Sequence, residues 1–120
     1  MPPRRIEDAD GRAALAAVQR GETARPALAT AVRWTLQRLA DAVPGNSVEV
    51  RVPPFAAVQA VPGPRHTRGT PPNVVETDAT TWLALATGAM HWDEAVAQSR
   101  VSASGSRADL TEFLPVSVDA

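Results

Sequence analysis

The segment Leu28–Val52, with the sequence LATAVRWTLQRLADAVPGNSVEVRV, contains a change of hydrophobic period that decides the fold class. In its first half the apolar residues recur at spacings of four, four, three and four, which places them on one face of a helix: Leu28, Val32, Leu36, Leu39 and Val43. Three successive turn formers, Pro44-Gly45-Asn46, end this helix. From Ser47 to Val52 valines alternate with polar residues, and this period of two predicts a strand with one buried face.

Helical and extended patterns flank this segment on both sides. Residues 8–20 before it have the pattern of a helix. The patterns that follow predict strands over 55–61 and 73–77, a helix over 78–87, a short helix near Asp93, a strand over 101–104 and a helical turn over 109–114. The short connection at Pro53-Pro54 predicts that the first two strands pair antiparallel. This order of elements predicts an α+β domain with a largely antiparallel sheet.

Length and composition bound the function. The 120 residues fit one domain, which we expect to span residues 1–120 with flexible ends over 1–7 and 116–120. Twelve basic and thirteen acidic residues give a net charge of −1, and without a basic excess no nucleic-acid partner is expected. No apolar stretch approaches the ~18 residues of a membrane span, so no stable membrane insertion is expected either. The start, MPPRRIED, lacks the apolar core of a signal peptide, and we expect a cytoplasmic protein.

The residues that could carry catalysis or hold a metal are few. The chain has no cysteine, which excludes disulfides and thiolate metal sites. Its two histidines, His66 and His91, lie on separate elements without a metal-binding spacing, and no nucleophile-elbow or phosphate-loop motif is present. We therefore expect no catalytic residue, no metal and no cofactor. An enzyme that uses His66 with Glu76 stays open as a weaker alternative.

One polar segment stands out, in the loop over 62–72 that holds four prolines and two glycines. Two guanidinium groups and an imidazole, from Arg65, His66 and Arg68, fall within four residues and could clamp a carboxylate or a phosphate. The alternative is a solvated loop whose arginines pair with Glu76 or Asp78 at the surface.

Large apolar side chains gather in the last third of the chain. They are Trp82, Leu85, Met90, Trp92, Val96, Leu110, Phe113 and Leu114. At helical spacing such residues usually form a core. Two tryptophans and a methionine within eleven positions also favour a pocket.

The C-terminal half resembles a known family. The stretches that carry the resemblance are DATTWLALATG at 78–88, MHWDEAVAQSRV at 90–101 and SASG at 102–105. They resemble the sterol carrier protein 2 (SCP2) superfamily, in which an acidic residue opens a helix that ends in Thr-Gly. Two more stretches, RVPPF at 51–55 and GPRHTRGTPPN at 63–73, are similar to a small branch of bacterial sterol-carrier orthologues. The resemblance covers roughly residues 25–115.

This resemblance implies a five-stranded, mainly antiparallel sheet covered by helices, with an apolar tunnel between them and no catalysis. The fifth strand would lie near Thr67–Thr70 or after Pro115. The residues that the resemblance places on the tunnel wall are Trp82, Leu85, Ala86, Met90 and Val96. Those that it places at one closed end are Leu110, Phe113 and Leu114.

Two functions follow as hypotheses. The first is non-catalytic carriage of a lipid or another apolar small molecule, sterol-like or fatty-acyl-like, with Arg65, His66 and Arg68 on an anionic head group. An unfilled void of ~300 Å³ would cost about 7 kcal/mol, so a tunnel has to be occupied, watered or collapsed. The alternative is an accessory module with a collapsed tunnel, which docks on a partner protein or a second copy of the chain.

Overall fold

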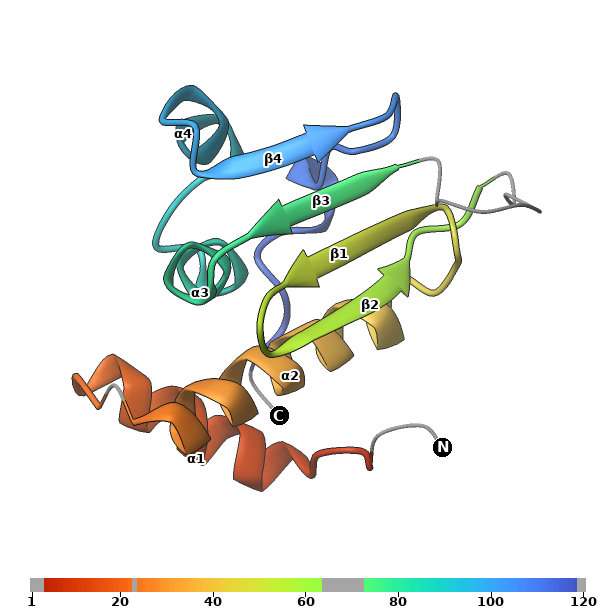
Figure 1. Ribbon diagram of the computed structural model, residues 1–120. Helices are drawn as coiled ribbons and strands as arrows, with labels where there is room; N and C mark the ends of the chain where they lie inside the picture. Colours follow the sequence, from red (N-terminus) through yellow and green to blue (C-terminus); the bar gives the residue numbers. More distant parts are fainter. Residues whose placement is uncertain (1–3, 23, 64–72, 119–120) are drawn as a thin grey trace.

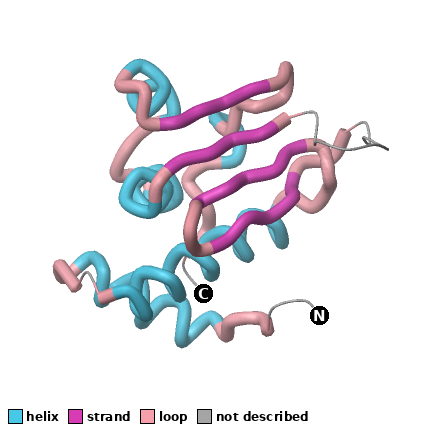
Figure 2. Tube along the Cα trace, viewed as in Figure 1, coloured by secondary structure: helices cyan, strands magenta, loops and turns pink. Residues whose placement is uncertain are grey.

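The computed structural model describes residues 4–22, 24–63 and 73–118. The elements follow in the order that the sequence predicts. They are α1 (Asp8–Gln19), α2 (Arg25–Ala42), β1 (Val48–Val52), β2 (Ala56–Ala60), β3 (Val74–Thr77), α3 (Ala79–Thr87), α4 (Trp92–Ala97), β4 (Val101–Ser104) and the 3-10 turn η1 (Thr111–Phe113). Figure 1 shows all of them around one sheet, and Figure 2 gives the helices and strands from the same side.

The sheet has four strands in the order β2-β1-β3-β4 and is mixed. The pairs β1–β2 and β3–β4 are antiparallel, as expected for the first of them, but β1 and β3 are parallel. A fifth strand is not seen in the part of the chain that the structure describes. Residues 116–118 are not extended into the sheet, and Thr67–Thr70 lie outside the described residues. The α+β class is confirmed, and the described residues form four of the five expected strands.

The parallel pair has a local cause at the start of β3. Strand β2 runs back to the end of the sheet where β1 begins, so the chain next enters the sheet beside β1 from that same end. The buried side chain of Asn73 holds it there, because its Nδ2 donates to the carbonyl of Ser47 at 2.7 Å. Its backbone carbonyl accepts from the amide of Glu49 at 2.9 Å, which places β3 alongside β1 in parallel.

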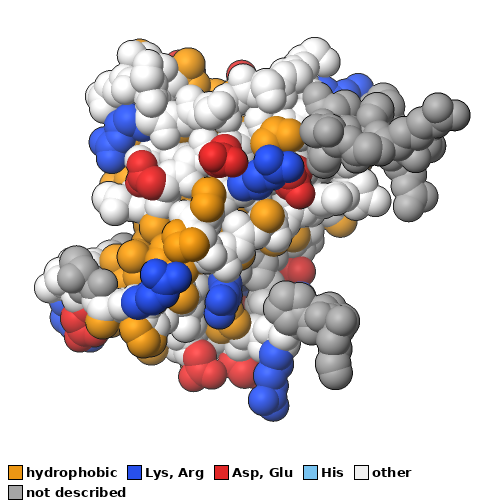
Figure 3. All heavy atoms as spheres, viewed as in Figure 1, with side chains coloured by type: hydrophobic (Ala, Val, Ile, Leu, Met, Phe, Trp, Pro, Cys, Tyr) orange, Lys and Arg blue, Asp and Glu red, His pale blue; other side chains and the backbone are white. Residues whose placement is uncertain are grey.

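One face of the sheet is covered and the other is open. Helix α2 and the C-terminal segment lie behind the sheet in Figure 1. The side chains of Val48, Val50 and Val52 on β1 are fully buried. The residues between them, Glu49 and Arg51, form an ion pair on the opposite face. Figure 3 views this open face and shows charged side chains of both signs over the strands. The alternation in the sequence thus separates core from solvent, as the period of two predicts.

Two tryptophans join the helices to one another. The ring of Trp34 on α2 is fully buried, and its Nε1 donates to Oδ1 of Asp8 on α1 at 3.0 Å. Helix α1 packs mainly on α2, on the side of α2 away from the sheet (Figure 1). Trp82 on α3 is also fully buried, and its Nε1 donates to Oγ1 of Thr35 on α2 at 2.8 Å. No helix of the described residues is long and apolar enough to cross a membrane.

Parts of both expected flexible ends are bonded to the helices. The backbone of Ile6 donates to and accepts from the side-chain amide of Gln37 on α2. At the other end, the amide of Val116 donates to the carbonyl of Ala86 at 2.9 Å. Both ends of the described chain therefore lie on the helical layer.

Candidate ligand-binding site

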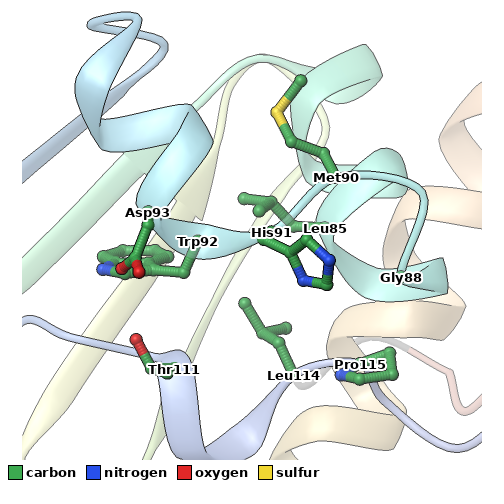
Figure 4. Close-up of a pocket in the computed structure, with 9 residues that line it drawn as sticks. All are labelled: Leu85, Gly88, Met90, His91, Trp92, Asp93, Thr111, Leu114 and Pro115. Carbon is green, nitrogen blue, oxygen red and sulfur yellow. The ribbon is translucent and has the colours of Figure 1, made fainter.

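A cavity of about 340 Å³ lies at the C-terminal end of α3. Asp78 begins this helix as expected, because its Oδ1 accepts from the amide of Thr81 at 2.8 Å. Gly88 ends it in the left-handed conformation, with a φ of 84° that favours glycine. The chain then turns to α4, whose first turn begins at His91. This turn between two helices forms one side of the cavity (Figure 4).

The C-terminal segment forms the other side. Thr111 and Leu114 point from it toward the residues of the α3–α4 connection (Figure 4). The bond from the amide of Val116 to Ala86 fixes this segment on α3. The backbone carbonyl of Ser117 also accepts from Nε of Arg38 on α2 at 2.9 Å. Two separate helices thus hold the segment that closes the cavity.

The wall is mixed, with somewhat more apolar than polar surface. The apolar lining residues are Leu85, Met90, Trp92, Leu114 and Pro115, and the polar ones are His91, Asp93 and Thr111. Among the described lining residues, Asp93 is the one carboxylate, and none of them is an arginine that could balance its charge. A small volume with apolar walls and a few polar groups is typical of a small-molecule site.

Hydrogen bonds to Asp109 hold Thr111, the first residue of η1, in place. The amide and hydroxyl of Thr111 both donate to Oδ1 of Asp109, at 2.8 and 2.6 Å. These hydrogen bonds, first that of the hydroxyl and then that of the amide, lower the pKa of Asp109 from its ordinary value. The turn that carries Thr111 is therefore held by an ionised carboxylate at neutral pH.

The residues expected on a tunnel divide into three groups. Leu85, Met90 and Leu114 line the cavity. Trp82, Ala86 and Leu110 are fully buried in the core between the helices and the sheet, and Phe113 packs against that core. Val96 is 48% exposed and lines neither the core nor the cavity. The described residues therefore show a filled interior with a hollow at its end, and no tunnel is seen among them.

The expected head-group residues cannot be placed. Arg65, His66 and Arg68 lie outside the described residues, so their clamp stays a prediction. Glu76 is exposed on the open face of the sheet, away from the cavity lining. The described part of the chain holds no group of three or more histidine, aspartate or glutamate side chains that could bind a metal.

Sequence reasoning missed part of the lining. Gly88, His91, Asp93, Thr111 and Pro115 line the cavity but are not among the site residues that the sequence predicts. What these residues share is their position in the sequence: each lies at or near the start or the end of a helix or 3-10 turn.

Comparison with known protein families identifies the chain. No curated protein matches it significantly. The family model described as bacterial SCP ortholog matches residues 24–116, from the start of α2 to the segment that closes the cavity. That match covers most of the chain and confirms the resemblance drawn from the motifs at 78–105. The chain therefore belongs to the bacterial SCP ortholog family.

Proposed function

We propose that the chain binds and carries a neutral, lipid-like molecule in the cavity between α3, α4 and the C-terminal segment, without catalysing a reaction on it. The observation that carries the proposal is a cavity of about 340 Å³ whose wall includes the apolar residues Leu85, Trp92 and Leu114. Membership of the bacterial SCP ortholog family supports the same class of ligand, because the SCP2 resemblance implies lipid binding.

Charge favours a neutral ligand at this site. Asp93 would repel a carboxylate or phosphate, and none of the lining residues that the structure describes carries a guanidinium to offset it. Its oxygen atoms and the imidazole of His91 can instead hydrogen-bond a hydroxyl group. An alcohol head on an apolar body, as in a sterol or a fatty alcohol, fits this set of groups. A fatty-acyl head on Arg65, His66 and Arg68 remains the prediction for an anionic ligand.

The energy of the cavity also favours occupation. Exposed lining residues such as His91 and Asp93 admit water, so the cavity is hydrated when no ligand fills it. A ligand that displaces this water gains ~0.8 kcal/mol for each buried methylene, and after the cost of ordering we expect an affinity no tighter than micromolar for a ten-carbon chain.

The test uses decanol as a neutral probe and native mass spectrometry of the full chain. Wild-type protein is expected to take up one decanol saturably, with a change in tryptophan emission because Trp92 lies in the wall. Thr111→Trp places a large ring in the cavity and should weaken uptake at least about tenfold. Glu112→Trp is the matched control, since Glu112 is the exposed neighbour on η1 and does not line the cavity.

Two results would contradict the proposal. One is no uptake of decanol by the wild type, and the other is equal uptake by the Thr111→Trp and Glu112→Trp variants. The accessory-module hypothesis would then take its place, and its test is whether the size of the protein in solution depends on concentration.

A further inference from the structure

A second hollow, of about 520 Å³, lies between the N-terminal segment, α2 and the edge strand β2. Ile6 stands on one side of it, Ala56 and Val58 of β2 on the other, and Ala40 of α2 between them. Small side chains at positions 40 and 56 leave this space open. It shares no lining residue with the cavity beside α3. We call it the α2–β2 groove.

The wall formed by the N-terminal segment is fixed. The Gln37 side chain accepts from the amide of Ile6 at 3.0 Å and donates to its carbonyl at 2.9 Å. The guanidinium of Arg5 donates to both carboxylate oxygens of Asp41, at 3.2 and 2.7 Å. These bonds keep the segment on α2 and separate from β2, so the groove between them persists.

The groove carries an excess of positive charge. Of the described residues that line it, Arg4, Arg5 and Arg33 are positively charged and only Asp41 is negatively charged, which leaves a local charge of +2. The hydrogen bond and charge of Arg5 lower the pKa of Asp41, which therefore stays ionised and engaged with Arg5 at neutral pH. On a chain with a net charge of −1, this local excess is complementary to an anion.

Phe55 lies at one end of the groove beside two arginines, Arg33 of the lining and Arg25 outside it. Nε of Arg33 donates to the backbone carbonyl of Phe55 at 3.3 Å. The guanidinium carbon of Arg25 lies 5.3 Å from the centroid of the Phe55 ring. Phe55 thus gives this end an apolar side chain with guanidinium groups beside it. The guanidinium group of arginine can donate two parallel hydrogen bonds to two oxygens of a carboxylate or phosphate.

We propose that the α2–β2 groove is a second ligand site, which takes a single-chain amphiphile with an anionic head. The head group binds Arg4 and Arg33, and the alkyl chain lies over Ile6, Ala40 and Val58. The two hollows then differ in charge, since the cavity beside α3 holds a carboxylate without an arginine and the groove holds arginines in excess. The chain would therefore bind neutral and anionic amphiphiles at separate places.

The test compares decanoate with decanol at pH 7.5, because the two probes share a ten-carbon chain and differ in charge. Binding of each is measured by isothermal titration calorimetry on the full chain. The double variant Arg4→Gln/Arg33→Gln is expected to bind decanoate at least about tenfold more weakly and decanol unchanged. Arg12→Gln/Arg20→Gln is the matched control, because it removes the same charge from α1 and its end, outside the groove. It should leave the binding of both probes unchanged.

A variant that fills the groove gives a second test. Ala40→Trp fills the space for the alkyl chain and should also abolish decanoate binding, while inorganic phosphate alone should bind weakly to the wild type. Equal decanoate affinity in Arg4→Gln/Arg33→Gln and in Arg12→Gln/Arg20→Gln would overturn the proposal. The proposal would also be overturned if Arg4→Gln/Arg33→Gln weakened binding to vesicles of anionic phospholipid but left decanoate binding unchanged, because the arginines would then bind a membrane surface. Failure of decanol binding with decanoate binding intact would instead contradict the proposed function of the other cavity.

Discussion

Thr35 is a fully buried polar residue, and its hydroxyl joins α2 to α3. The hydroxyl donates within α2, to the carbonyls of Ala31 and Val32 at 2.8 and 3.0 Å. It also accepts from Nε1 of Trp82 at 2.8 Å. The family resemblance implies a tunnel wall for Trp82, and its helical spacing is typical of a core; in the structure its ring is fully buried and its N–H joins α3 to α2. A tryptophan at helical spacing does not reveal which of these roles it has, because both require an apolar environment.

We predict that Thr35→Val lowers the free energy of unfolding by about 1–3 kcal/mol. Valine keeps the shape of threonine but removes the acceptor, so the N–H of Trp82 is left buried without a partner. Chemical denaturation measures the loss. In a Trp82→Phe background the same substitution should cost much less, because the N–H is already gone. An equal cost in the two backgrounds would show that the hydrogen bond is not the cause.

At the scale of elements, the sequence patterns predict the helices and strands better than their pairing. The period of two in Val48–Val52 and the capping residue Asp78 both lead to the elements that the structure shows. The parallel pairing of β1 and β3 depends on Asn73, whose polar side chain bonds to Ser47 and to the amide of Arg107. These partners lie 26 and 34 positions away in the sequence, so no local pattern contains them.

The N-terminal segment provides a pH-dependent element. Arg5 holds Asp41 by two hydrogen bonds, and the pKa of Asp41 lies below its ordinary value of 3.8 in the folded state. The stability that this pair contributes is therefore fully present above that value, and it is lost as the pH falls through the lower, folded-state pKa.

We predict that Asp41→Asn lowers the Tm at pH 7 and that the difference from wild type shrinks as the pH falls below 3.8 and through the folded-state pKa of Asp41. At low pH the wild-type carboxyl is protonated and resembles the amide, so both proteins lack the ion pair. Thermal denaturation between pH 2.5 and 7 measures the difference. Glu112→Gln is a suitable control, since Glu112 has no ion pair among the described residues. A difference that stays constant over this range would contradict the role of charge.

At the scale of the whole molecule, sequence reasoning establishes the fold class and the family but not the shape of the hollow. Leu85, Met90 and Leu114 reach the cavity, whereas Ala86 and Leu110 fill the core. The difference depends on how the C-terminal segment folds back over α3, through the bond from Val116 to Ala86. The α2–β2 groove was not predicted at all, because Arg4 and Arg33 are far apart in the sequence and no periodic pattern connects them.

Helix α1 stands apart from the rest of the molecule in two respects. The family match begins at residue 24 and leaves it out, and α1 packs mainly on α2. Its buried residues, Gly11, Leu15 and Ala17, include two small ones, so it buries little apolar area. Local unfolding of α1 should therefore need less free energy than unfolding of the sheet.

We predict that the amides of α1 exchange faster than those of β1 and β3, and that Gly11→Ala increases exchange in α1 alone. A Cβ at position 11 would lie 2.1 Å from the ring of Trp34, so alanine must displace the helix, even though it is normally the better helix former. Hydrogen exchange with mass spectrometry measures both effects, and Gly11→Ala should leave decanol binding unchanged because the cavity is formed by residues 85–115. Slower exchange in α1 after the substitution would mean that helix propensity outweighs the contact with Trp34. Faster exchange in the sheet as well would mean that α1 and the sheet unfold together.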